Sequence, residues 1–157
     1  MTKSKRRTVV LMADDDEDDR LLVEGALIGH PVELVCVENG VELMDYLFCR
    51  GKYNIKDYPR PDLILLDLNM PKKDGRQALQ EIKTHPNLKS LPVVVLTTSG
   101  EECDVAGCYQ LGANSYIVKP VTFDGFIETL KVFHLYWDET ATLASREPPE
   151  SCLEKTT

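Results

Sequence analysis

Five short apolar runs, each followed by a helical pattern, constrain this chain more than any other feature of its sequence. The runs are largely unbroken, which is typical of strands buried on both faces of a parallel sheet. They are residues 8–13, 31–37, 63–66, 91–96 and 115–118. Because strands that alternate with helices form right-handed crossovers, this pattern predicts a doubly wound α/β sheet. We expect five parallel strands in the order 2-1-3-4-5, with helices on both faces.

The helices between these strands are predicted from apolar spacing and from their stop signals. The first helix should bury a stripe made of Leu21, Gly25 and Ile28, with Leu22 and Ala26 beside them. The last helix should begin near Thr122 and continue to Trp137. The other predicted helices span about 40–48, 75–84 and 101–111. A polar segment at 49–60 is longer than a usual helix–strand connection and is interpreted as a surface insertion.

A length of 157 residues fits one domain with a sizeable core. We assign residues 1–7 to a basic N-terminal tail and residues 8–137 to the domain. Periodicity is lost from Asp138 onward, so residues 138–157 are expected to be a mostly flexible tail.

Composition limits the compartment and the partners. No apolar run approaches the length of a membrane span, and the five cysteines show neither CxxC nor metal spacing. Reduced thiols of this kind are typical of the cytoplasm. A net charge of -8 argues against general nucleic-acid binding. We therefore expect a cytoplasmic protein that binds neither nucleic acid nor membrane.

Acidic residues follow two of the predicted strands. Asp67 ends the third strand, and an unbroken acidic run, Asp14 to Asp19, follows the first. Helix capping would need only one or two of these acids. In the predicted order, strands 1 and 3 are neighbours, so Asp14, Asp15 and Asp67 should meet in one crevice. Three such carboxylates repel one another unless a cation lies among them.

A hard divalent ion with oxygen ligands and several waters fits this crevice, which indicates Mg²⁺. We expect Asp15 and Asp67 to bind it directly, Asp14 partly through water, and the Asn69 backbone carbonyl to complete the site. Strand 4 should bring Thr97 alongside, and strand 5 should bring Lys119. Their hydroxyl and ammonium groups can hold phosphoryl oxygens, so Asp67 is predicted to accept phosphate.

The chain resembles a response-regulator receiver domain, a family with the flavodoxin-like strand order. The resemblance covers about residues 8–137 and rests on five motifs. They are the acidic pair Asp14-Asp15, the acceptor Asp67, the hydroxyl residue Thr97, the aromatic Tyr116 and the pair Lys119-Pro120. One subgroup is more similar still: the small stand-alone receivers of cyanobacterial and bacterial phytochromes. This closer resemblance rests on the segments PRPDLILLDLNMPKKDGRQ and PVVVLTTS and on the insertion at 49–60.

The resemblance implies how such a protein signals. Asp67 would take phosphate from a phosphohistidine on a sensor histidine kinase, here one of phytochrome type. Thr97 and Tyr116 would then act as switch residues that change the surface made by helix 4, strand 5 and helix 5. The Lys119–Pro120 peptide is expected to be cis. The tail is far below domain size, so output would be contact with a downstream protein, and the chain would not be an enzyme.

Two other classes of protein share some of these features. Haloacid-dehalogenase-like phosphatases also use an aspartate nucleophile with Mg²⁺, but they need a second Asp two residues on, where this chain has Asn69. No glycine-rich phosphate loop follows the first strand, which disfavours nucleotide binding. Tyr116 could be an ordinary strand aromatic. The three histidines, His30, His85 and His134, have no partner spacing and are taken as structural or solvated.

The last predicted helix carries more apolar residues than one buried face requires. Its final turns place Val132, Phe133, Leu135 and Tyr136 away from the predicted sheet-facing stripe. A surface patch of this kind usually marks an interface. We expect a homodimer through helix 4, strand 5 and helix 5, as the family often forms. The alternative is that the tail from Asp138 folds back and covers these side chains.

Overall fold

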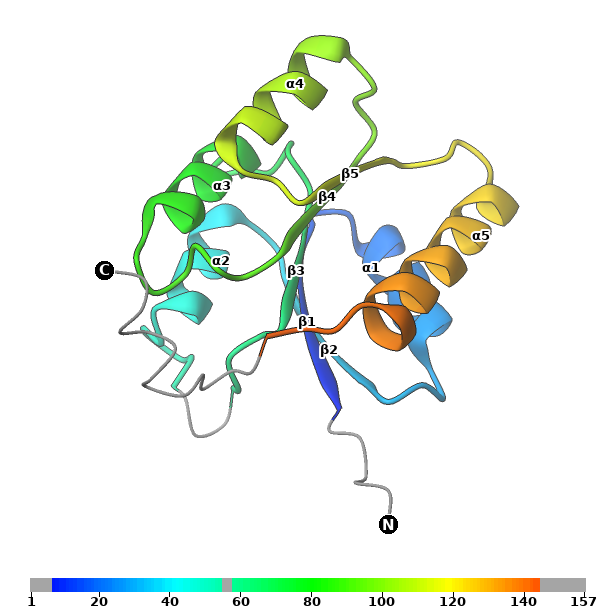
Figure 1. The fold of residues 1–157 in the computed structure, drawn as a ribbon, viewed down its shortest axis with the longest axis horizontal. Helices are drawn as coiled ribbons and strands as arrows, with labels where there is room; N and C mark the ends of the chain where they lie inside the picture. Colours follow the sequence, from blue (N-terminus) through cyan, green and yellow to red (C-terminus); the bar gives the residue numbers. More distant parts are fainter. Residues whose placement is uncertain (1–6, 55–57, 145–157) are drawn as a thin grey trace.

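Five parallel strands form a single sheet in the order β2-β1-β3-β4-β5 (Figure 1). The structure is a computed structural model that describes residues 7–54 and 58–144. The strands are β1 (Thr8–Ala13), β2 (Val32–Val37), β3 (Leu63–Leu66), β4 (Val93–Thr97) and β5 (Ser115–Val118). The predicted strand order and the parallel pairing are therefore confirmed.

Helices α1 and α5 cover one face of the sheet, and α2, α3 and α4 lie on the other side (Figure 1). The helices are α1 (Glu17–Leu27), α2 (Gly40–Leu47), α3 (Gly75–Thr84), α4 (Glu102–Leu111) and α5 (Phe123–His134). Successive strand residues point to opposite faces, so Leu11 and Ile64 belong to the core under α2 and α3, whereas Val10 and Leu65 face α1 and α5. The central strands are buried on both faces, as the unbroken apolar runs predict.

Helix α1 buries only part of the predicted face: Leu22 and Ala26 are half-buried against the core. Val23 and Leu27 are its buried residues, whereas Leu21 and Ile28 are exposed. Residues four apart lie on the same helix face, and Val23 and Leu27 have that separation. Three consecutive apolar residues begin at Leu21, so the pattern alone did not determine which of them faces the sheet.

Helix α5 does not stop at the predicted boundary of the domain. A π-helix (Leu135–Thr140, labelled η1) continues it, and Asp138 is buried. The Thr8 hydroxyl donates a hydrogen bond to Asp138 Oδ1 (2.8 Å), which fixes the helix extension to the start of β1. The rest of the predicted tail, residues 145–157, lies outside the described residues, as do residues 1–6.

The described part of the insertion after α2 packs against the domain. Tyr53 is buried, and its ring lies 5.2 Å from that of Tyr46 and 5.1 Å from that of Tyr58 between centroids. The Tyr46 hydroxyl donates to the Pro59 carbonyl (2.8 Å). These aromatic contacts fix both ends of the insertion, while residues 55–57 lie outside the described part of the chain. Within the described residues, no helix has the combination of length and apolar character that crossing a bilayer requires.

Candidate functional site

The sheet's backbone hydrogen bonds continue one residue beyond β1 and β3 and bring the acidic residues together. The Asp14 N–H donates to the Val37 carbonyl (3.1 Å), and the Asp67 N–H donates to the Ala13 carbonyl (2.9 Å). Asp14 and Asp67 therefore follow adjacent strands at the same edge of the sheet. One carboxylate oxygen from each of Asp14, Asp15 and Asp67 lies within 4.8 Å of the others.

These three carboxylates differ in their exposure to solvent. Asp14 and Asp67 are buried, whereas Asp15 is exposed. Burial raises the pKa of the Asp14 carboxyl to about 6, although the hydrogen bond from Lys119 and the one from the Asp16 N–H oppose the rise. The negative charge of Asp67 raises that pKa further. A carboxyl group held in this way gains from any additional positive charge in the crevice.

Lys119 supplies one buried positive charge to the crevice. Its Nζ donates to Asp14 Oδ2 and to Asp19 Oδ2, each at 2.7 Å, and lies 3.6 Å from Asp67 Oδ2. Burial lowers the pKa of this ammonium, but the hydrogen bonds to Asp14 and Asp19 outweigh burial and leave the pKa raised. Lys119 is therefore a permanent cation that faces three carboxylates.

The expected cis peptide is absent: the Lys119–Pro120 bond is trans, because the described residues contain no cis peptide bond. That prediction was wrong. A trans bond is the preferred form before proline by about 0.5–1 kcal/mol. Lys119 also reaches its position without the cis form, since its N–H donates to the Thr97 carbonyl (2.7 Å) while its Nζ contacts Asp14.

Thr97 and Tyr116 lie on neighbouring strands near the crevice, but they have different surroundings. Thr97 is fully buried, and its hydroxyl makes no hydrogen bond to any part of the chain that the structure describes. The Tyr116 hydroxyl donates to the Ser99 carbonyl (2.7 Å) in the loop between β4 and α4. The Ser99 hydroxyl in turn donates to Asp104 of α4, and Arg76 of α3 pairs with Asp104 at 2.8 Å. A chain of polar contacts therefore joins Tyr116 to the start of α4.

The structure assigns separate tasks to the acidic run. Asp16 caps α1, accepting from the N–H groups of Asp18 and Asp19, and the Asp19 side chain pairs with Lys119. Sequence reasoning missed Asp19 as a partner of Lys119, and it missed Arg20, whose Nη1 donates to the Asp14 carbonyl (2.7 Å). The position of Asp19 in the first helical turn after the strand was the available signal.

The loop after Asp67 depends on a close backbone approach. The Gly75 N–H donates to the Leu68 carbonyl (2.8 Å), and a Cβ at Gly75 would lie 2.2 Å from the Asp67 carbonyl oxygen. Only glycine fits there without moving the residue that carries the predicted acceptor. Asn69 is exposed in the same loop, two residues after Asp67.

The donor set fits a hard divalent cation. All the candidate ligands are oxygens, one of the carboxyls has a raised pKa because of burial, and Lys119 alone offsets only part of the negative charge. A divalent ion among Asp14, Asp15 and Asp67 would offset the rest and would leave positions for water and an incoming anion.

Comparison with known proteins agrees with this geometry. Residues 10–131 match the response regulator receiver domain family. The chain is 43% identical over 139 residues to the response regulator Rcp1 of Synechocystis sp., an alignment that covers 86% of this chain and 92% of that protein.

Two solved structures are similar over most of the chain. The crystal structure of the Mn²⁺-bound form of Rcp1 has a TM-score of 0.83 and 41% identity, covering 88% of this chain and 99% of that one. The phosphorylated cyanobacterial phytochrome response regulator RcpA has the same TM-score, 0.83, and 43% identity over the same shares, 88% and 99%. From the fold, the site and these matches, the chain belongs to the response regulator receiver domain family.

Proposed function

We propose that this protein accepts a phosphoryl group on Asp67 from the phosphohistidine of a phytochrome-type sensor histidine kinase. The observation that carries the proposal is the surroundings of Asp67: its Oδ2 lies 3.6 Å from the buried Lys119 ammonium and beside the Asp14-Asp15 pair. The protein then signals by contact with a downstream protein and is not an enzyme in its own right. The four cysteines in the described part of the chain are free, three of them exposed, and such thiols suit the cytoplasm.

In the proposed transfer, an Asp67 oxygen forms a bond to phosphorus while the bond from phosphorus to the kinase imidazole nitrogen breaks. The imidazole leaves, and the product is an acyl phosphate on Asp67. Mg²⁺ held by Asp14, Asp15, Asp67 and the Asn69 carbonyl would neutralise charge on the acceptor and the phosphoryl group. Lys119 offers its ammonium to one phosphoryl oxygen, and the Thr97 hydroxyl offers a hydrogen bond to another.

A phosphatase of the haloacid-dehalogenase type has no support. The position two residues after Asp67 holds Asn69, whose amide cannot transfer a proton as that mechanism requires. The family to which the chain belongs also differs.

The proposed output runs from Thr97 through Tyr116 to the surface of α4, β5 and α5. If the Thr97 hydroxyl moves to meet a phosphoryl oxygen, the β4–α4 loop that follows it moves as well. Tyr116 is bonded to that loop at Ser99, and Ser99 contacts Asp104 of α4. Movement at Thr97 would therefore pass through the backbone of this loop to the polar contacts of Ser99, and from there to Tyr116 and α4.

The kinase assignment rests on similarity to RcpA, which is described as a phytochrome response regulator. The downstream partner is left as a protein that binds the α4–β5–α5 surface. A direct test of the kinase is transfer of phosphate from an autophosphorylated phytochrome kinase to this protein, with an unrelated sensor kinase as the control. Transfer at equal rates from both kinases would contradict the phytochrome assignment while leaving Asp67 phosphorylation intact.

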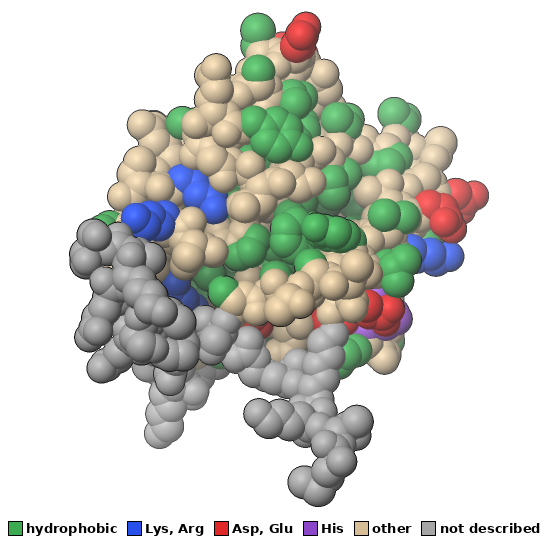
Figure 2. Space-filling view, viewed as in Figure 1, with side chains coloured by type: hydrophobic (Ala, Val, Ile, Leu, Met, Phe, Trp, Pro, Cys, Tyr) green, Lys and Arg blue, Asp and Glu red, His purple; other side chains and the backbone are tan. Residues whose placement is uncertain are grey.

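The α4–β5–α5 surface is also the proposed homodimer interface. Figure 2 shows hydrophobic side chains gathered over this face. Val132, Leu135 and Tyr136 are 65%, 55% and 53% exposed. Phe133 was expected to join them, but it is only 5% exposed, because it packs in the core under α1 and α5. Phe133 therefore cannot contact a second copy, and the proposed interface contains the other three predicted residues.

Binding of Mg²⁺ should weaken as the pH falls from 7 to 5. The pKa of Asp14 is raised to about 6 by burial, so at pH 5 most Asp14 side chains carry a proton that competes with the metal. At one pH unit below the pKa of Asp14, the affinity for Mg²⁺ should be about tenfold lower than when Asp14 is fully ionised. Without metal, the free energy of unfolding depends on pH in the opposite direction. The folded state binds a proton at Asp14 more readily than the unfolded state does, so the contribution of Asp14 to stability becomes more favourable as the pH falls through 6.

Isothermal titration with Mg²⁺ at a series of pH values measures this effect. The Asp14→Asn variant is the control, since it has no carboxyl to protonate there and should lose most of the dependence near pH 6. An affinity that stays constant from pH 7 to 5 in the wild type would contradict Asp14 as a ligand.

Replacing Thr97 with alanine should leave Mg²⁺ affinity almost unchanged and weaken the response to phosphorylation. The Thr97 hydroxyl has no hydrogen bond within the described residues, so its removal costs little stability. Amide exchange in α4 with and without a phosphoryl mimic measures the response. A variant that responds as the wild type does would remove Thr97 from the proposed path.

A further inference from the structure

We propose that His30, His134 and Glu139 form a second metal site, selective for Zn²⁺. It lies at the end of the sheet where the strands begin, opposite the aspartate crevice at their carboxyl ends. His30 lies in the turn before β2, His134 is the last residue of α5, and Glu139 belongs to η1. One ligand atom from each of the three residues lies within 4.8 Å of the others. The donors are two imidazoles and one carboxylate, which differ in kind from the all-oxygen set in the aspartate crevice.

His134 is the centre of this arrangement. Its side chain is 8% exposed, and both ring nitrogens are buried without a hydrogen bond in the described structure. Buried imidazole nitrogens nearly always have a partner, so this pair requires an explanation. Two carboxylates face the ring nitrogens: Asp138 Oδ2 lies 3.5 Å from Nδ1, and Glu139 Oε1 lies 3.4 Å from Nε2.

The separation between His134 Nε2 and Glu139 Oε1 suits two ligands of one ion. At 3.4 Å the two atoms are too far apart for a good N–H···O hydrogen bond. Bonds of about 2.0–2.1 Å from a tetrahedral ion give a distance of about 3.3 Å between ligand atoms. The observed separation is close to that edge of a tetrahedron.

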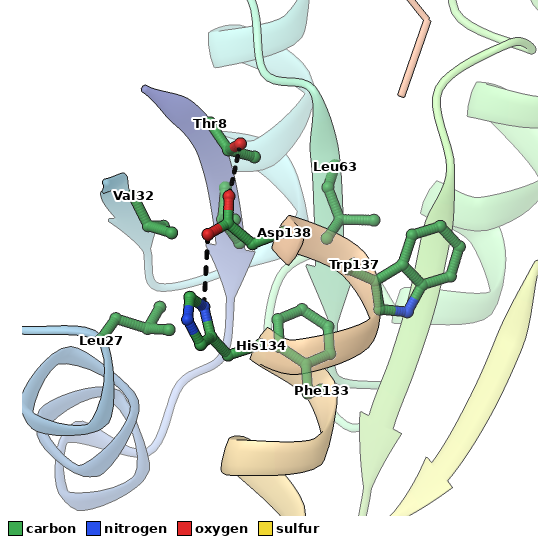
Figure 3. Close-up of a pocket in the computed structure, with 9 residues that line it drawn as sticks. Thr8, Leu27, Val32, Leu63, Phe133, His134, Trp137 and Asp138 are labelled. Carbon is green, nitrogen blue, oxygen red and sulfur yellow. Dashed lines mark hydrogen bonds and ion pairs between the residues drawn. The ribbon is translucent and has the colours of Figure 1, made fainter. Parts of the chain in front are cut away.

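The other nitrogen of His134 faces a carboxylate that is already held in place. Figure 3 shows Asp138 between Thr8 and His134, with one carboxylate oxygen directed to each. Thr8 Oγ1 donates to Asp138 Oδ1 at 2.8 Å. Zinc-binding histidines commonly donate their second N–H to such a carboxylate, which fixes the tautomer and leaves the other nitrogen for the metal. At 3.5 Å the contact between Nδ1 and Asp138 is itself longer than a good hydrogen bond, so metal binding would have to draw these two groups together, with Nε2 facing Glu139.

His30 completes the protein ligands from a separate element. Its ring centroid lies 3.8 Å from that of His134, and its backbone is fixed because its N–H donates to Leu27 and its carbonyl accepts from Val32. The side chains of His30 and Glu139 are exposed, so both can adjust by small rotations around an ion. Two histidines, one glutamate and a water give the tetrahedral set that zinc prefers.

The π-helix explains how Glu139 reaches this position. Its wider turn places residues five apart on one face, so Glu139 lies over His134. Zinc would therefore join the turn before β2 to the end of the last helix. Because η1 also carries Leu135 and Tyr136, the metal would hold part of the proposed interaction surface in place.

Calorimetric titration of the full chain with Zn²⁺ tests the proposal. Excess Mg²⁺ is included to compete at the aspartates, and the cysteines are alkylated to remove thiol ligands. We expect one zinc ion per chain, and His30→Asn and Glu139→Gln should each weaken binding by at least about tenfold. The matched controls His85→Asn and Glu128→Gln, which lie outside the cluster, should bind zinc as the wild type does.

A second measurement separates loss of a ligand from loss of the fold. Zinc should slow amide exchange in residues 135–140 of the wild type and should not do so in His30→Asn, whose metal-free exchange should match that of the wild type. Co²⁺ bound in place of zinc should give the visible absorption of a tetrahedral ion. Absence of saturable zinc binding, or binding that is unchanged in both ligand variants, would overturn the proposal.

Discussion

Replacing Asp67 with asparagine should abolish phosphorylation, both by a kinase and by a small phosphodonor such as acetyl phosphate. The amide of asparagine has nearly the same shape as the carboxylate, but it cannot act as the nucleophile that forms an acyl phosphate. The other carboxylates of the crevice have different tasks, and the exposed Asp15 is assigned to the metal. Asp14 is hydrogen-bonded to Lys119 and the Asp16 N–H, and Asp19 is held by the same lysine. We therefore expect complete loss, measured as the absence of a phosphorylated species by intact mass.

The fold of the Asp67→Asn variant should be preserved. The substitution removes one of three clustered negative charges, so without metal the unfolding temperature should stay the same or rise. Asp18→Asn is the matched control, since Asp18 is an exposed member of the acidic run and should not affect phosphorylation. A stable Asp67→Asn protein that still acquires acid-labile phosphate at the wild-type rate would refute Asp67 as the acceptor.

The sequence was sufficient for the fold because its apolar runs are short, buried and evenly separated. Leu63–Leu66 is buried throughout, and it pairs with β1 as the predicted doubly wound strand order requires. Once β1 and β3 are neighbours, the residues that follow them must meet. The convergence of Asp14, Asp15 and Asp67 is therefore a consequence of topology.

Other features depended on contacts that no local pattern records. The buried face of α1 could not be chosen among three consecutive apolar residues. Phe133 was placed on the surface because other apolar residues of the last helix already formed a complete sheet-facing stripe. The actual helix register places Phe133 in the core with Leu130 and Phe126. The cis peptide expected at Lys119–Pro120 came from the family resemblance alone, and the described residues contain no cis bond.

The end of the last helix illustrates the same limit. Apolar periodicity stops near Trp137, so the pattern predicts a mostly flexible tail beyond it, with order at most in its first turns. The structure continues as a π-helix, in which Asp138 accepts a hydrogen bond from the hydroxyl of Thr8, a residue 130 positions away in the chain. His30 and His134 have no sequence spacing that suggests a pair. Their rings meet only because the end of α5 packs beside the turn that precedes β2.

Replacing Leu135 and Tyr136 with aspartate should convert a homodimer into a monomer. Both side chains are more than half exposed and lie on η1, which continues α5, and Tyr136 lines a groove with Ser115 and Ile117 of β5. In a two-fold symmetric interface each residue is buried twice, so the double variant removes four apolar contacts and adds four charges.

The size of the effect follows from the area still available for burial. Full burial of such a side chain is worth roughly 1.5–3 kcal/mol, and about half of that is available to residues that are already half covered. Four contacts then contribute about 3–6 kcal/mol, so the dimer dissociation constant should rise by more than about a hundredfold. Because the two residues are exposed, the monomer should remain folded.

Sedimentation velocity over a range of concentrations measures this change, with and without beryllofluoride as the phosphoryl mimic. Leu21→Asp is the matched control, since Leu21 is a similarly exposed apolar residue on α1, away from the proposed interface. Phe133 is unsuitable for such a test because a charge in its buried position would unfold the domain rather than separate two copies. A wild-type protein that remains monomeric at high concentration under both conditions would rule out the homodimer. A double variant that still dimerises like the wild type would place the interface elsewhere.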